Sequence, residues 1–210
     1  MASGEHYFTS RPGSDAKLHP LSVRLAGRDL ELTTAAGIFS PDRIDAGTQV
    51  LLADAPAAPP SGDLLDLGCG WGPVALTLAL ESPQATVWAV DVNERALDVV
   101  RRNAASLGLT NLNAVLPDDV PDDLAFRAIW SNPPIRVGKA ELHALLLRWL
   151  PRLDGDADAW LVVQRNLGSD SLQRWLGGAL SSEFTVRRAS TSKGYRVIHV
   201  RAGTSSEGHF

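Results

Sequence analysis

The sequence contains one cysteine, one methionine and two tyrosines among its 210 residues. Because Cys69 stands alone, no internal disulfide can form, which favours the cytoplasm as the compartment. Residues 1–9 lack a basic segment followed by an apolar run, so they do not resemble a secretory signal. No stretch approaches about 18 uninterrupted apolar residues, so we expect no membrane contact. The five histidines do not follow metal-ligand spacing, and we expect no metal.

The overall charge is slightly negative, but basic residues collect toward the end of the chain. The net charge is −4, with 44% hydrophobic and 21% charged residues, as in ordinary globular domains. Between residues 184 and 206 there are five basic side chains and no acidic one. Such a patch suits a phosphate backbone, and a solvated strand face explains it equally well. The five residues are Arg187, Arg188, Lys193, Arg196 and Arg201.

The order of hydrophobic patterns predicts an α/β fold preceded by a small extension. Residues 1–55 contain alternating apolar residues on both sides of a turn at 26–29, which indicates a β-hairpin, and a short helix over 44–55. We expect this extension to pack on a core domain over 56–203, followed by a loose tail over 204–210. In the core, strands are predicted at 64–67, 86–90, 112–116, 125–130, 159–164, 184–189 and 195–201, with helices at 73–81, 94–107, 139–150 and 169–180. Asn93 is predicted to cap the second of these helices.

This alternation predicts a doubly wound, seven-stranded, mainly parallel sheet. No helix separates the last two strands, so we expect them to be antiparallel neighbours. The length suits one domain with a filled core, and we expect a monomer.

A glycine-rich segment follows the first core strand. Gly68, Gly70 and Gly72 occupy alternate positions after Asp66 and before a helix that begins at Pro73. Glycines there let a ligand approach bare backbone. The spacing differs from the dinucleotide pattern G-x-G-x-x-G, and no Lys-Ser/Thr follows as in a phosphate-binding loop. A nucleotide-like ligand explains the pattern, and so does a tight strand-to-helix connection.

Acidic residues follow the next two strands. Asp91 comes directly after the second strand, where a carboxylate can bind both hydroxyls of a ribose or, alternatively, cap a helix. Asp118 and Asp119 follow the third strand, where an acid or a backbone N–H can meet an adenine edge. Solvated loop acids are the alternative interpretation of that pair.

The segment Asn132-Pro133-Pro134-Ile135 follows the fourth strand, at the edge where open α/β sheets bind ligands. Two prolines fix the backbone and donate no hydrogen bond, so the turn presents carbonyl oxygens. The Asn132 amide oxygen and the Pro133 carbonyl can accept both protons of a planar NH2 group. This directs the nitrogen lone pair toward a methyl sulfonium and stabilises the charge that grows on nitrogen. An ordinary turn is the alternative.

With these motifs placed, the sequence resembles class I S-adenosylmethionine-dependent methyltransferases with a Rossmann-like fold. More narrowly, it resembles the small-methyltransferase family that includes bacterial 16S ribosomal RNA guanine-N2 methyltransferases. The resemblance covers most of the chain. It rests on His6-Tyr7-Phe8, the hairpin, Gly37-Ile38-Phe39-Ser40, Asp45-Ala46-Gly47-Thr48, DLGCGWG at 66–72, VDVNERA at 90–96, SNPPIRVGK at 131–139 and KGYRV at 193–197.

The resemblance implies a site for S-adenosylmethionine, with S-adenosylhomocysteine as product. Gly68, Cys69, Gly70 and Gly72 would form the methionine side, with Asp66 near the amino acid end of the donor. Asp91 and Val92 would lie at the ribose, Asp118 and Asp119 near the adenine, and Phe39 and Thr48 would cover the site. Residues 132–135 would hold the acceptor amine, with Asn132 also adjoining the donor. Ile135 departs from many amino-methylating enzymes, in which an aromatic residue often stacks on the target base at this position.

Four basic residues near the acceptor motif are candidates for contact with substrate: Arg136, Lys139, Lys193 and Arg196. The hypothesis favoured by the resemblance is N2-methylation of guanine in ribosomal RNA. The substrate would be free RNA or the small ribosomal subunit. The alternatives are methylation of a protein glutamine, methylation of a small molecule, and a binding module that has lost catalysis. The chemistry does not separate guanine-N2 from adenine-N6, since both offer a planar amine.

Overall fold

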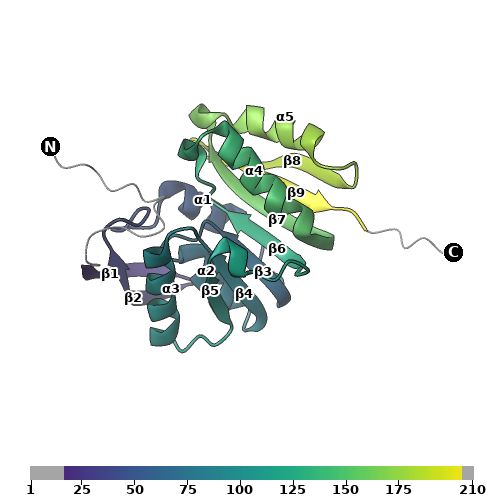
Figure 1. The fold of residues 1–210 in the computed structure, drawn as a ribbon. Helices are drawn as coiled ribbons and strands as arrows, with labels where there is room; N and C mark the ends of the chain where they lie inside the picture. Colours follow the sequence, from purple (N-terminus) through teal and green to yellow (C-terminus); the bar gives the residue numbers. More distant parts are fainter. Residues whose placement is uncertain (1–16, 205–210) are drawn as a thin grey trace.

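The computed structural model describes residues 17–204, which form a hairpin and a seven-stranded sheet with helices on both faces (Figure 1). The hairpin comprises β1 (Leu18–Leu25) and β2 (Arg28–Ala35). Its turn is two residues long, shorter than predicted, because Ala26 and Gly27 both adopt positive φ, at 48° and 72°. This backbone matches the twist of the paired strands, so pairing continues up to the turn.

The large sheet has the strand order β5-β4-β3-β6-β7-β9-β8. All neighbours are parallel except β9, which runs antiparallel to both β7 and β8. The predicted fold class and the antiparallel pairing of the last two strands are confirmed. The strands are β3 (Ser61–Leu67), β4 (Gln84–Val90), β5 (Leu112–Val115), β6 (Phe126–Ser131), β7 (Leu153–Gln164), β8 (Phe184–Ser192) and β9 (Tyr195–Ala202).

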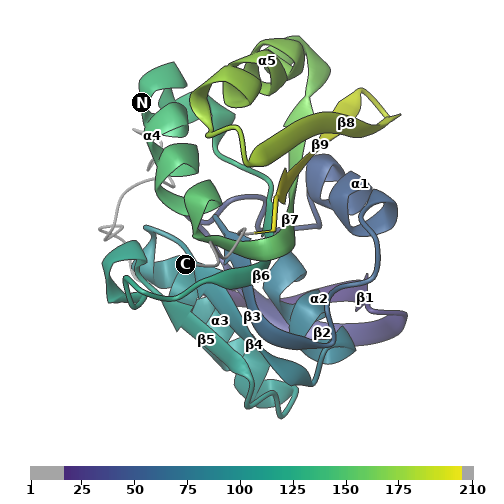
Figure 2. The same cartoon turned by 90° about the vertical axis from the view of Figure 1, so that its right-hand side faces the viewer.

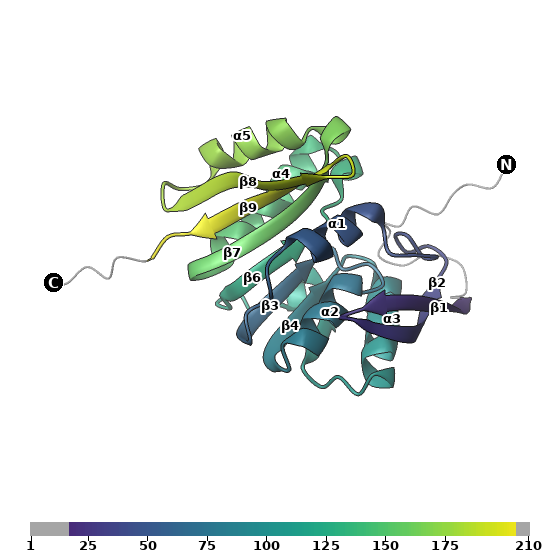
Figure 3. The same ribbon diagram turned by 180° about the vertical axis from the view of Figure 1, so that it is seen from behind.

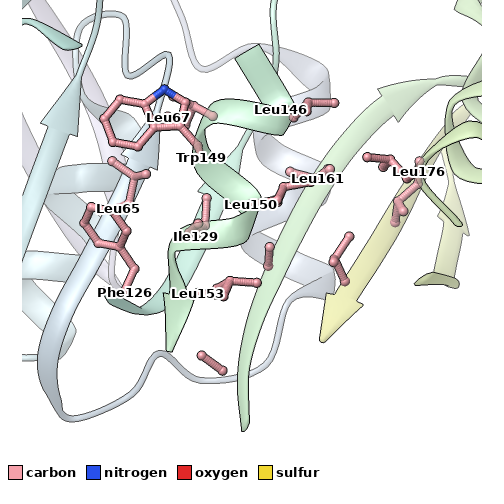
Figure 4. Packing of buried hydrophobic residues seen from close by; sticks show 14 of the residues in the cluster. Leu65, Leu67, Phe126, Ile129, Leu146, Trp149, Leu150, Leu153, Leu161 and Leu176 are labelled. Atoms are coloured by element: carbon pink, nitrogen blue, oxygen red, sulfur yellow. The ribbon is translucent and has the colours of Figure 1, made fainter. Parts of the chain in front are cut away.

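Five helices cover the sheet: α1 (Ala46–Asp54), α2 (Pro73–Glu81), α3 (Glu94–Ser106), α4 (Lys139–Trp149) and α5 (Ser169–Ala179). Helices α4 and α5 lie on one face, and α1, α2 and α3 lie on the other (Figures 1 and 3). Neighbouring residues of one strand therefore enter different cores. Leu64 packs with α2, whereas Leu65 points into the core beneath α4. Figure 4 shows Leu65 in that core with Phe126, Trp149 and Ile129.

Strand β7 begins six residues earlier than the sequence pattern predicts. Residues 153–158 contain Asp154, Gly155 and Asp156, which disfavour a strand. Asp156 adopts a positive φ of 61°, and the pairing between β6 and β7 shifts register in this region. The early part of β7 is therefore irregular. It is held to β6 by the pairing of Leu153 with Phe126.

The hairpin and the segment that follows it are tied to the core. Asn103 of α3 accepts a hydrogen bond from the Thr33 N–H at 2.8 Å and donates one to the Thr33 carbonyl at 2.9 Å. Apolar residues of both strands pack with Trp71, Leu76 and Val99. This attachment brings residues 36–45 to the carboxyl edge of the sheet.

Candidate active site

A cavity of about 420 Å³ opens at the carboxyl edge of the sheet. It lies where the order of connections reverses between β3 and β6, the place where open α/β sheets bind ligands. One half lies over the carboxyl ends of β3 and β4, and the other lies over the carboxyl ends of β6 and β7 and the first residue of β9. Its lining includes Phe39, Asp45, Gly68, Gly70, Asp91, Val92, Asn132, Pro133, Pro134, Ile135, Arg136, Gln164, Leu167 and Tyr195.

The glycine turn forms the floor of the first half. Gly68 and Gly70 have positive φ values of 78° and 55°, and a Cβ on either would meet no atom closer than 3.9 Å. The backbone is thus bare toward the cavity. The N–H groups of Gly68 and Cys69 both donate to the Val90 carbonyl, at 2.8 and 3.1 Å. Because these donors are used within the fold, the turn is poorly suited to a phosphate, in agreement with its sequence.

Asp91 connects the glycine turn to the next helix. One carboxylate oxygen accepts the Gly70 N–H and the other accepts the Asn93 N–H, each at 2.9 Å. Burial raises the pKa of Asp91. Asn93 caps α3, as the sequence predicts, and its amide nitrogen also donates to the Gly37 carbonyl at 2.9 Å. Trp71 donates to the Ser40 carbonyl at 3.1 Å, so both ends of the segment that carries Phe39 are anchored.

Asp66 and Cys69 lie beneath this turn and do not line the cavity. Asp66 is 2% exposed and accepts the Ala75 N–H at 2.9 Å, so it fixes the start of α2. Burial raises its pKa to about 8, with a further contribution from Asp91. Burial also raises the pKa of the Cys69 thiol, which keeps it protonated and unsuited to act as a nucleophile.

Asn132 is held in one orientation by residues from the start of α1. Its amide nitrogen donates to Asp45 Oδ2 at 2.9 Å and to Thr48 Oγ1 at 3.1 Å. The Asp45 carboxylate only accepts, which fixes which end of the amide is nitrogen. The amide oxygen is therefore the atom of Asn132 that remains available as an acceptor in the cavity. The same Asp45 oxygen caps α1 by accepting the Gly47 N–H at 2.8 Å.

The two prolines continue the same wall. The Pro133 carbonyl accepts the Ile135 N–H at 2.9 Å and, having two lone pairs, can accept a second hydrogen bond. Ile135 begins a short 3-10 turn and is half-buried, with its side chain against the core beneath α4. Three apolar side chains on the lining are unusually exposed for their type: Phe39 at 39%, Val92 at 44% and Leu167 at 42%.

Several of the residues predicted for the site lie outside the cavity lining. Thr48 is buried behind Asn132, and Gly72 is the residue before α2, where a Cβ would lie 2.9 Å from Val100. Asp118 forms an ion pair with Arg148 at 2.9 Å, and Asp119 is exposed, so only Pro117 of that segment reaches the cavity. Among the basic candidates, Arg136 lines the cavity, Lys139 and Lys193 are exposed outside the lining, and Arg196 pairs with Asp170. Residues His6 to Phe8 fall outside the described residues.

Four polar or aromatic lining residues were not among the predicted site residues: Asp45, Asn93, Gln164 and Tyr195. A signal for Gln164 is its position as the last residue of a parallel strand. Tyr195 begins β9, and an antiparallel strand begins at the edge where parallel strands end. Placing it in the site therefore requires knowing the direction of β9. Asp45 is recognisable in the sequence only as a residue before a helix, where capping explains it.

Within residues 17–204, no group of three His, Cys, Asp or Glu side chains is arranged as a metal site would require. In the same range, no helix has the length and apolar character needed to cross a membrane.

Comparison with known proteins identifies the family. The methyltransferase small domain model matches residues 29–199. Uncharacterized protein YbxB of Bacillus subtilis is 32% identical over 200 residues, which cover 94% of this chain and 98% of that protein. Ribosomal RNA small subunit methyltransferase C of Stutzerimonas stutzeri is 36% identical over 200 residues, covering 91% of this chain and 57% of the relative. The chain thus spans little more than half of that methyltransferase.

A solved structure agrees at the level of the fold. The 16S rRNA N2 G1207 methyltransferase of Thermus thermophilus, in complex with AdoMet and guanosine, superposes with a TM-score of 0.74 at 20% identity. The match covers 91% of this chain and 52% of that one. The family resemblance found in the sequence is confirmed: the chain belongs to the methyltransferase small domain family, whose methyl donor is S-adenosylmethionine.

Proposed function

We propose that this protein transfers a methyl group from S-adenosylmethionine to the exocyclic N2 amine of guanine in ribosomal RNA. The observation that carries the proposal is the fixed orientation of Asn132, whose amide nitrogen is held by Asp45 and Thr48. Its oxygen is left as an acceptor for a planar amine. The names of the Stutzerimonas and Thermus relatives, both ribosomal RNA methyltransferases, support RNA as the substrate class.

The first half of the cavity fits the donor. The bare backbone at Gly68 and Gly70 gives room for its methionine part, and the Asp91 carboxylate adjoins the position for a ribose diol. Val92 and Phe39 offer apolar surface to an adenine ring. Two acidic side chains on the lining, Asp45 and Asp91, favour a ligand that carries a positive charge.

Bound S-adenosylmethionine supplies an electrophilic methyl group on a positively charged sulfur. The amine nitrogen attacks the methyl carbon, a C–N bond forms as the C–S bond breaks, and the nitrogen then releases one proton to solvent. Asn132 Oδ1 and the Pro133 carbonyl accept hydrogen bonds from the amine protons, which hold the lone pair in line with the methyl group. As positive charge develops on nitrogen, both acceptors stabilise it more strongly than they stabilise the neutral amine.

Basic side chains near the opening suit an RNA backbone. Arg136 lines the cavity, and Lys139 and Lys193 are exposed. Within residues 17–204 none of these three forms an ion pair, so their charges are available to phosphate. Arg196 is less suited to this role because Asp170 already neutralises it.

The test is methyl transfer from labelled S-adenosylmethionine to total RNA, ribosomal subunits and release factor, followed by nucleoside analysis. We expect label in N2-methylguanosine of ribosomal RNA. Asn132→Ala should lower kcat by about 10²- to 10³-fold, the usual effect of losing an aligned transition-state partner. Its affinity for donor should stay within about twofold. The matched control is Asn113→Ala, at an exposed position of the edge strand β5, which should retain full activity.

Label on release factor, or donor binding without transfer to any RNA, would overturn the RNA assignment. Full activity of Asn132→Ala would overturn the mechanism.

A further inference from the structure

The acceptor half of the cavity contains two facing side chains that the mechanism above does not use. Gln164 ends β7 and Tyr195 begins β9, and the two are direct partners in the antiparallel ladder. Both line the cavity together with Asn132. Direct partners in such a ladder have side chains on the same face, about 5 Å apart. The two side chains therefore form one surface beside the amine-binding motif.

The contacts that a Cβ at Gly47 would make show how close Tyr195 lies to Asn132. A Cβ at Gly47 would be 3.0 Å from Tyr195 Cε1, 3.0 Å from Asp45 Oδ2 and 3.3 Å from Asn132 Nδ2. The tyrosine ring, the carboxylate and the amide thus converge on a single point. A substrate amine bound at Asn132 would carry the rest of its ring system close to Tyr195.

The position of Tyr195 is fixed by the turn before it. Lys193 and Gly194 have positive φ values of 47° and 81°, and the Gly194 carbonyl accepts the Arg165 N–H at 2.9 Å. Part of the ring packs on the core beneath α1, and α1 itself lies against β7 and β9 (Figure 2). The side chain is half-buried, so it combines a packed part with a part open to the cavity. A ring held in this way loses little conformational freedom on binding.

Charge and hydrogen bonding suit the two residues to different tasks. Burial, and then the charge of Asp45, raise the pKa of Tyr195, so its ring is uncharged at neutral pH. Gln164 has both a donor and an acceptor, and its side chain has no hydrogen-bond partner among the described residues. The amide is therefore available to a ligand.

We propose that Tyr195 is the platform on which the target base stacks and that Gln164 binds the polar edge of that base. This inference rests on the proposed function, and it names the residues that select a base as the acceptor. Ile135 leaves the family's usual aromatic position without a ring, and Tyr195 supplies one from β9. With the N2 amine of guanine at Asn132, the adjacent N1–H and O6 match the oxygen and nitrogen of the Gln164 amide.

Fluorine NMR can test the platform without any methyl transfer. The chain has two tyrosines, so protein labelled with 3-fluorotyrosine gives two signals, and Tyr195→Phe assigns them. The protein is first saturated with S-adenosylhomocysteine, so that added nucleotide cannot occupy the donor site. Guanosine 5′-monophosphate should then shift the Tyr195 signal by ring current. No shift at saturating nucleotide, with binding shown by calorimetry, would overturn the proposal.

Kinetics provide the second readout. Tyr195→Leu should lower kcat/KM by about ten- to hundredfold, the usual effect of losing one base–aromatic contact. Tyr195→Phe should stay within about threefold, and donor affinity should be unchanged in both. Adding Ile135→Phe to Tyr195→Leu should restore activity, because it returns a ring to the family's position. Equal losses for the Leu and Phe variants would show that the hydroxyl matters and would overturn stacking.

Gln164→Ala should reduce the preference for guanosine over adenosine monophosphate, whereas the matched control Gln84→Ala, at the opposite edge of the sheet, should not. Unchanged preference would overturn the role of Gln164. The failure of the proposed function has a different signature. If wild-type protein methylates release factor instead of RNA, the RNA assignment is lost. The platform fails separately, whichever substrate is methylated, if the Tyr195 signal does not shift when nucleotide is bound.

Discussion

Replacing Gly47 by alanine should separate the stability of α1 from the chemistry of the cavity. The residue lies in the first turn of the helix, and its φ is not in the left-handed region. Alanine is favoured over glycine in helices by about 1 kcal/mol. Against this, the new Cβ would lie 3.0 Å from both Tyr195 and Asp45, so these side chains must move by a few tenths of an ångström. The two effects should leave the free energy of unfolding within about 0.5 kcal/mol of wild type.

Activity should respond much more strongly. Asp45 holds Asn132, so a displaced carboxylate also displaces the acceptor oxygen. A misplacement of 1 Å can cost about 10²-fold in rate, so a shift of a few tenths should cost about tenfold in kcat. The matched control is Gly177→Ala in α5, where an added Cβ meets nothing within 4 Å. It should stabilise the protein by about 1 kcal/mol and leave kcat unchanged. Urea unfolding and methyl transfer measure the two effects. Equal kcat for both variants would refute the reasoning.

Three further predictions concern the donor half. Asp66 has a pKa raised from 3.8 to about 8, so its contribution to stability is full below pH 4 and is lost as the pH rises through 8. As the pH rises over that range, the free energy of unfolding of Asp66→Asn, measured in urea, should therefore increase relative to wild type by up to about 1.4 kcal/mol per pH unit. Parallel pH profiles of the two unfolding free energies would contradict this. Gly72→Ala should cost more stability than Gly108→Ala, because both have positive φ but only Gly72 would place a Cβ 2.9 Å from Val100; equal melting temperatures would count against it. Asp91→Asn should weaken donor binding at least about tenfold in calorimetry, and an unchanged affinity would remove Asp91 from the site.

Local sequence predicts the backbone of the donor half, because the turn and the starts of its helices depend on neighbours in the chain. Alternate glycines after a buried strand predict the turn, and Asn93 before an amphipathic segment predicts the cap that the structure has. The helix predicted over 73–81 matches α2 because Pro73 marks its first residue. The role of Asp66 could not be predicted in this way. A carboxylate after a strand looks the same in sequence whether it meets a ligand or, as here, the N–H of Ala75.

The acceptor half depends instead on contacts between distant parts of the chain. Asn132 meets Asp45 and Thr48 across more than 80 residues, and Tyr195 comes from the last strand of the chain. Sequence patterns of period two or 3.6 carry no information about such pairs. The early part of β7 was missed for a related reason, since Asp154 and Gly155 are accommodated by a register shift that only the neighbouring strand reveals.

The antiparallel direction of β9 has a chemical consequence. If β9 were parallel to β7, its first residue would lie at the opposite edge of the sheet, and Tyr195 would be a strand length away from Asn132. Because β9 reverses, the short turn at Lys193 and Gly194 lies at the carboxyl edge. Tyr195 therefore lines the cavity, and the basic side chain of Lys193 lies two residues before it, outside the lining. A base stacked on Tyr195 would thus bring its phosphate near Lys193. Lys193→Glu should therefore weaken the binding of RNA and of guanosine monophosphate and leave guanosine, which has no phosphate, unaffected. An equal loss for guanosine would contradict this geometry.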